Sequence, residues 1–248
     1  MSIVHCPHSV VHCPLSVVHY PLSTIRCPSY MTLFNEIAFL LKKETLLELR
    51  QKYALGGILL YVASTVFVVK LSFLKTEPEV WNALFWIISL FASLNAVVKS
   101  FVQENSARQL FYYQLANPTA IILSKILYNI VLLLVLNALT YLVLSLMVGN
   151  PVKTSPPYFL AILMGSVGFS ITFTFISAIA AKANNSATMM AIMSFPIVLP
   201  ILVTLIRMTK SALQKGSTSW GNDILILSSI DLILIALCFL LFPFLWKD

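Results

Sequence analysis

The sequence predicts an all-α protein that crosses a membrane several times. Of its 248 residues, 59% are hydrophobic and only 10% are charged, whereas about a quarter of a soluble domain is usually charged. The apolar residues gather in six stretches, each close to the roughly 20 residues that a helix needs to cross a bilayer. A soluble protein with a very apolar core does not need such long stretches. We therefore assign the net charge of +7 to loops and lipid contacts rather than to nucleic-acid binding.

The segment before the first span, residues 31–53, is predicted to be an amphipathic helix in the plane of the lipid headgroups. Leucine and isoleucine recur at roughly helical spacing, and charged residues from Lys42 to Lys52 interrupt them. Basic residues on such a helix can face anionic lipid. The alternative is a short soluble helix.

Six spans are expected in a transmembrane domain of residues 54–248. They are 55–74, 81–98, 126–148, 158–181, 187–206 and 224–246. If the N-terminus is cytoplasmic, nine Lys and Arg residues outside the first thirty lie on the inner side and six on the outer side. This bias favours both termini in the cytoplasm, although the basic residues of 208–222 argue the other way.

The longest polar connection, residues 99–120, then faces the cytoplasm. Residues 104–113 suit a short helix because Ser106 is a good helix start, and Asn117-Pro118 is a break before the third span. Such a helix could dock into a groove on a soluble partner. The alternative is an ordinary loop.

Small residues at every fourth position predict a smooth face on the fourth span. They are Ser166, Ser170, Thr174 and Ala178, with Gly165 and Gly168 nearby. This spacing lets a second helix approach closely, which we favour over a ligand pocket. In the fifth span, Pro196 and Pro200 each remove a backbone donor and kink the helix. Such kinks occur in moving helices and in static bundles.

Asp231 is the one carboxylate deep in a span, so it is a candidate intramembrane polar site. A hydrogen bond to Asn129 or Asn137 of the third span would satisfy it, and we favour this structural role over a functional one.

Three absent patterns limit the chemistry. There is no GxxxxGK[ST] phosphate loop, no HExxH motif, and no histidine in residues 31–248. We therefore expect no catalytic residues, no metal site, and no ATP hydrolysis by this chain itself.

Three segments resemble the CcmB family, the membrane subunits of the haem-exporter-type ABC transporter of bacterial cytochrome c maturation. They are "KKETLLELRQKYAL", "ENSARQLFYYQLANPTAIILSK" and "MSFPIVLPILV". In the second, the resemblance rests on Glu104, Ser106, Gln109, Leu110, Pro118 and Lys125.

The resemblance implies an ABC-2-type permease fold in the bacterial inner membrane. It also implies a homodimer bound to two copies of a CcmA ATPase, with CcmC and the haem chaperone CcmE as further partners. The assembly would use ATP, bound by the partner subunit, to release haem-loaded CcmE, with haem as the handled ligand. Contacts with the ATPase would come from Glu104, Ser106, Arg108, Gln109, Leu110, Phe111 and Tyr112. The alternatives are an ABC-2 permease that exports a lipid or drug, and a membrane scaffold that transports nothing.

The first thirty residues are near-copies of a seven-residue unit that holds three cysteines and all four histidines. Its Cys-Pro pairs resemble haem-regulatory motifs. However, a repeated seven-nucleotide unit, GTCCATT, passes through all three reading frames and encodes Val-His-Cys-Pro-Leu-Ser-Ile, close to the observed units. We therefore expect residues 1–30 to be disordered, or to be repeat DNA translated upstream of a start at Met31.

Overall fold

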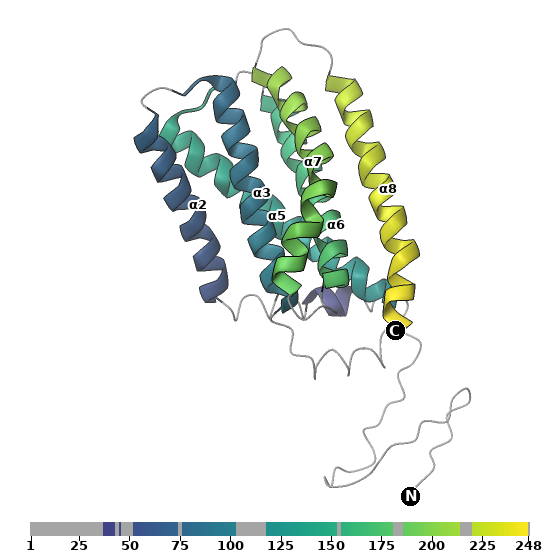
Figure 1. Ribbon diagram of the computed structural model, residues 1–248. Helices are drawn as coiled ribbons and strands as arrows, with labels where there is room; N and C mark the ends of the chain where they lie inside the picture. The colour runs from purple at the N-terminus through teal and green to yellow at the C-terminus, as the bar shows by residue number, and fades with distance from the viewer. Residues whose placement is uncertain are drawn as a thin grey trace, which may run out of the picture.

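The computed structural model describes residues 37–42, 45, 52–73, 76–102, 118–152, 155–180, 186–213 and 220–247. Within these ranges the chain is helical between short connections, and no strand occurs (Figure 1). The long helices are α2 (Lys52–Ser72), α3 (Pro78–Val102), α5 (Pro118–Val148), α6 (Ser155–Ala180), α7 (Ser186–Leu213) and α8 (Trp220–Lys247). The predicted class, a polytopic all-α membrane protein, is confirmed.

Five of these helices are long and apolar enough to cross a membrane. Their apolar stretches are Pro78–Val97, Ala120–Val148, Pro156–Ala180, Thr188–Leu213 and Gly221–Leu241. The apolar part of α2, Gly56–Ser72, is shorter, but α2 packs beside α3 and α5. By length, the structure therefore supports five of the six expected spans. The remaining span, that of α2, stays a prediction.

Two of the expected spans are too short, because the helices continue through charged residues. α5 begins at Pro118 rather than at 126, and Lys125 is buried within it. α7 continues past 206 to Leu213, and its basic residues in this stretch have acidic partners. Arg207 Nη2 lies 3.8 Å from Asp223 Oδ1, and Lys210 Nζ lies 2.9 Å from Glu79 Oε1.

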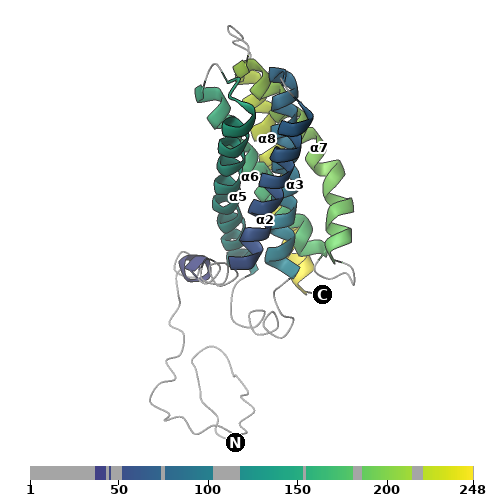
Figure 2. The same cartoon turned by 90° about the vertical axis from the view of Figure 1, so that its left-hand side faces the viewer.

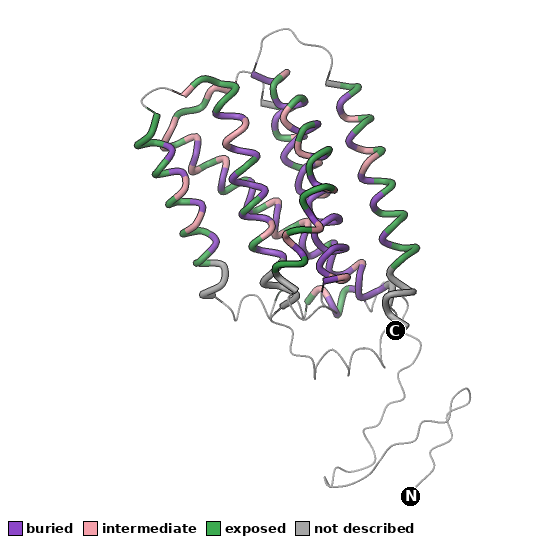
Figure 3. Tube along the Cα trace, in the orientation of Figure 1, coloured by how far each residue is buried: buried purple, intermediate pink, exposed green. Residues whose placement is uncertain are grey.

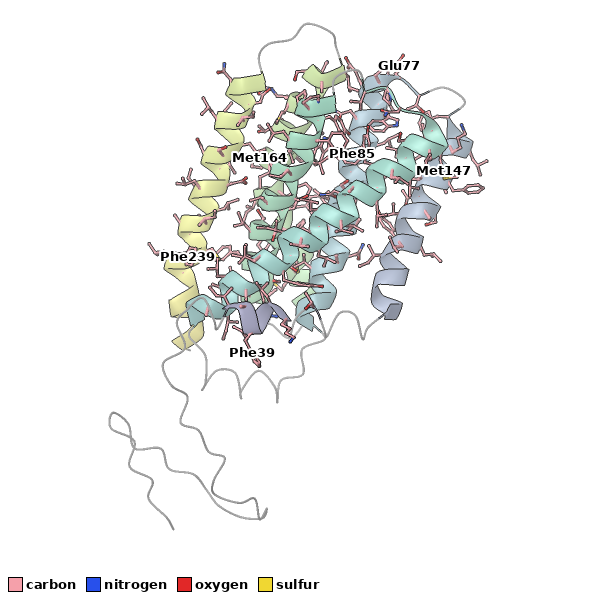
Figure 4. The ribbon with its side chains drawn as sticks, turned by 180° about the vertical axis from the view of Figure 1, so that it is seen from behind. Phe39, Glu77, Phe85, Met147, Met164 and Phe239 are labelled. Carbon is pink, nitrogen blue, oxygen red and sulfur yellow. The ribbon has the colours of Figure 1, made fainter. Side chains whose placement is uncertain are left out.

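Consecutive helices run in opposite directions, so the bundle has two distinct ends (Figures 1 and 2). We call the end where α2, α5 and α7 begin the base, and the opposite end the top. The base also holds the helical residues 37–42, where Ile37 and Leu40 pack against Ala120 and Ile121 at the start of α5. Phe39 points away from the bundle there (Figure 4). This placement fits the amphipathic helix expected in 31–53, most of which lies outside the described residues.

α6 is the central helix. It packs against α3, α5, α7 and α8, and its trace is buried along most of its length (Figure 3). α8 lies at the edge of the bundle and leaves many large apolar side chains exposed. The core is therefore arranged around the helix whose sequence carries the small residues.

Candidate functional site

The small polar residues of α6 form its contact with α5. Asn129 Nδ2 donates to Thr174 Oγ1 over 2.8 Å, and Asn137 Nδ2 donates to Ser166 Oγ over 3.0 Å. Ser170 Oγ donates to the Ile126 carbonyl over 2.9 Å. The five polar side chains that make these bonds are all buried, and so is Ile126. The face predicted from spacing is thus a hydrogen-bonded helix–helix contact.

The two glycines of α6 are positions of close approach. A Cβ on Gly165 would lie 2.8 Å from the ring of Trp86 on α3. A Cβ on Gly168 would lie 2.8 Å from Asp231 Oδ1 on α8. Both distances are too short for a real contact, so glycine allows α3 and α8 to pack on either side of α6.

Asp231 is buried against α6, with 5% of its surface exposed. Neither carboxylate oxygen has a hydrogen-bond partner among the described residues. The bond expected from Asn129 or Asn137 is not formed; both amides donate to hydroxyl groups of α6 instead. A spacing argument could not show this, since it does not say which face of α5 meets α8.

An aromatic cluster near the top was missed by the sequence analysis. Trp81 and Phe85 of α3 meet Tyr141 of α5 and Tyr158 of α6, with ring centroids 5.4 to 6.3 Å apart. Figure 4 labels Phe85 in this region. The sequence feature that could have predicted the cluster is the four-residue spacing of Trp81 and Phe85, which places both on one face of a helix. Because Trp81, Phe85 and Tyr158 are fully buried, the cluster packs this region rather than forming an open site.

Among the described residues, two grooves open on the apolar surface. One, of about 480 Å³, lies between α5 and α6 and includes Tyr141, Leu146 and Phe159. The other, of about 200 Å³, lies between α3 and α7, with Phe173 of α6 in its wall. Neither includes Asp231.

The described residues offer no cluster of three or more His, Cys, Asp or Glu side chains that could hold a metal ion. Cys238 on α8 is a free, buried thiol. The seven residues expected to contact an ATPase, from Glu104 to Tyr112, lie outside the described residues. The flanking helix ends, Val102 of α3 and Pro118 of α5, are both at the base.

The family model for "CcmB protein" matches residues 35–244. The chain belongs to the CcmB family. Members of this family are permease subunits of the ABC transporter of cytochrome c maturation, which work with partners such as an ATPase. The match spans the base helix and the six long helices except the last residues of α8. A comparison with curated proteins found no match.

Proposed function

We propose that this chain is the membrane subunit through which a separate ABC ATPase drives the release of haem-loaded CcmE. The observation that carries the proposal is the family match over residues 35–244. A CcmA-like ATPase would hydrolyse ATP, and two copies of this chain, together with CcmC-like and CcmE-like proteins, would form the membrane assembly. The chain itself is proposed to be non-enzymatic.

The ATPase is proposed to dock at the base, which we place on the cytoplasmic side of the bacterial inner membrane. By position in the sequence, nine basic residues outside the first thirty fall on the cytoplasmic side and six on the other, a bias that supports this placement through the positive-inside rule. The top residues Arg207 and Lys210 also have acidic neighbours. Both termini would then be cytoplasmic.

The base has a path by which an ATPase could act on the bundle. The helical residues 37–42 pack on the first turn of α5, and the proposed docking segment, 99–120, leads into that same turn. Motion of the docking segment would therefore reach both α5 and the base helix. From α5, buried hydrogen bonds lead to the central helix α6.

Haem is proposed to be handled by the assembly rather than ligated through histidine by this subunit. Residues 31–248 contain no histidine, which is a common axial ligand of haem iron. Any histidine ligands of haem would then belong to the partner proteins, and methionine or tyrosine of this subunit stays open as a ligand.

Co-purification with tagged CcmA-like and CcmE-like proteins tests the assembly. Leu110→Asp and Phe111→Asp should release the ATPase, because an unpaired carboxylate buried in an interface costs several kcal/mol. Arg108→Ala is the milder control, since exposed ion pairs contribute about 0–1 kcal/mol. A membrane-fraction blot should give normal amounts of all three variants.

Two results would contradict the proposal. Undiminished ATPase binding by both aspartate variants would remove residues 104–113 from the docking role. ATP hydrolysis by the purified complex that does not respond to the CcmE-like protein would favour a scaffold or an exporter of another substrate.

A further inference from the structure

α7 is attached to the bundle very unevenly along its length. All of its hydrogen bonds and ion pairs to other helices, among the described residues, come from the stretch 206–210. Asn82 Nδ2 donates to the Ile206 carbonyl over 3.1 Å, and Trp86 Nε1 donates to Thr209 Oγ1 over 2.9 Å. Arg207 and Lys210 add the ion pairs to α8 and α3. The top half of α7 is therefore fixed to two neighbouring helices.

The top half of α7 also has more buried residues per turn than the base half. In the top half, residues 201–213, about two residues per turn are buried, namely Ile201, Thr204, Leu205, Met208, Thr209, Ala212 and Leu213. In the base half, residues 188–200, only one residue per turn is buried, namely Met190, Ser194 and Val198. A single line of contact resists sideways rotation of a helix much less than a wide stripe does.

The two prolines stand at the border between these halves. Pro196 and Pro200 have no N–H, so the carbonyls of residues 192 and 196 lose their helical donors and the ladder is interrupted over one turn. Sharp kinks in helices usually occur at proline. Figure 2 shows α7 leaning away from the other helices toward its Ser186 end.

Space for movement exists beside the base half. The groove of about 200 Å³ separates it from α3, with Leu90 and Phe91 on one wall and Phe195 and Leu199 on the other. Phe91 and Phe195 touch across the groove, with ring centroids 6.3 Å apart. The hydroxyl of Ser194, which lines the groove, donates to the carbonyl of Ala191 in its own helix. It therefore does not hydrogen-bond to α3.

We propose that the base half of α7 is a hinged arm that swings about Pro196 and Pro200, opening and closing the groove against α3 while the top half stays fixed. Ile192 is eight residues from Pro200, or about 12 Å along the helix. A change of about 20° in the kink therefore moves Ile192 by about 4 Å. The inference concerns this chain alone and does not depend on which substrate the assembly handles.

Spin-label distances test the arm in the full-length chain in lipid nanodiscs. The four native cysteines are replaced by alanine, and one label is placed at Leu163 of the central helix, which is 46% exposed. The second label is placed either at Ile192, 66% exposed in the arm, or at Val203, 53% exposed in the fixed half. The Leu163–Ile192 distance distribution should be broader than the Leu163–Val203 distribution by about 4 Å, or should split into two populations.

Variants without the prolines test whether Pro196 and Pro200 are the cause of the movement. Pro196→Ala with Pro200→Ala should narrow the Leu163–Ile192 distribution to the width of the Leu163–Val203 pair. Pro157→Ala is the matched control, because Pro157 lies in the first turn of α6, where the missing N–H has no helical acceptor. It should leave both distributions unchanged.

Equal widths for the two pairs in the chain with its prolines would overturn the proposal, and this comparison stands even if the double-alanine variant fails to fold. A Leu163–Ile192 distribution that stays broad after both prolines are removed, with Leu163–Val203 unchanged, would also overturn the hinge.

Discussion

α6 and α8 are both long, apolar helices, yet they occupy opposite positions in the bundle. α8 has the higher mean hydropathy, but 22% of its apolar stretch is buried, against 72% for α6. α6 owes its central position to Gly165, Gly168 and its buried hydroxyl groups, which let other helices approach and hydrogen-bond. Because lipid tails are as apolar as leucine, hydrophobicity does not draw helices together in a bilayer. In this protein, small residues mark the centre and large apolar residues mark the lipid-facing edge.

Truncation of a buried side chain on α6 and of an exposed one on α8 should give the largest contrast. Ile176→Ala on α6 removes a fully buried side chain and should lower the free energy of unfolding by about 2 kcal/mol or more, through lost packing contacts. Ile233→Ala on α8, where the side chain is 58% exposed, should change it by less than about 0.5 kcal/mol. Denaturation in mixed micelles measures both. Equal losses would mean that α8 is packed as tightly as α6.

Glycine substitutions sharpen the comparison. Gly165→Ala places a methyl group 2.8 Å from the Trp86 ring, which is itself buried and bonded to Thr209. The resulting overpacking should cost about 1–3 kcal/mol. Gly221→Ala in the first turn of α8 meets no atom within 4 Å and should be neutral or slightly stabilising, because alanine favours helix. A loss of stability at Gly221 as large as that at Gly165 would contradict the assignment of α6 as the closely packed helix.

Removing one hydroxyl group from each helix should have a smaller effect on the free energy of unfolding. Ser166→Ala removes the acceptor of Asn137 and should cost about 0.6 kcal/mol, the average for hydrogen bonds between membrane helices. The matched control is Ser229→Ala on α8, whose exposed hydroxyl donates to the Leu225 carbonyl of its own helix and to no other described residue. This control should leave the free energy of unfolding unchanged in the same denaturation assay. If both variants were silent, the hydrogen bonds between α5 and α6 would contribute nothing measurable.

The smallest effect is expected at the one site where α6 and α8 meet through a carboxylate. Asp231→Asn keeps the shape of the side chain beside Gly168 and removes a carboxylate that has no hydrogen-bond partner among the described residues. Stability should change by less than about 0.5 kcal/mol or rise, and cytochrome c maturation should continue. Loss of maturation with normal membrane levels of the variant would instead assign Asp231 a functional role.

The sequence allowed the class, the order of the helices and the close-packing face of α6 to be predicted. Apolar stretches are set by the bilayer thickness, and residues four apart share a helix face whatever surrounds them. The same reasoning failed at the span boundaries beside Lys125, Arg207 and Lys210, which were left outside the expected spans although they lie within α5 and α7. Arg207 and Lys210 have acidic partners on other helices, and such partners cannot be read from a single helix.

Composition and periodicity by themselves determined that this chain is a multi-pass helical membrane protein, and its segments already resembled the CcmB family. Only the tertiary structure decided that Asn129 and Asn137 bond to α6 rather than to Asp231, that Trp86 lies against Gly165, and that α7 is fixed at one half and loosely packed at the other. The physical reason is that every span meets the same apolar solvent. The rotation and neighbours of each helix are therefore set by the fit of particular side chains, and that fit exists only once the helices are side by side.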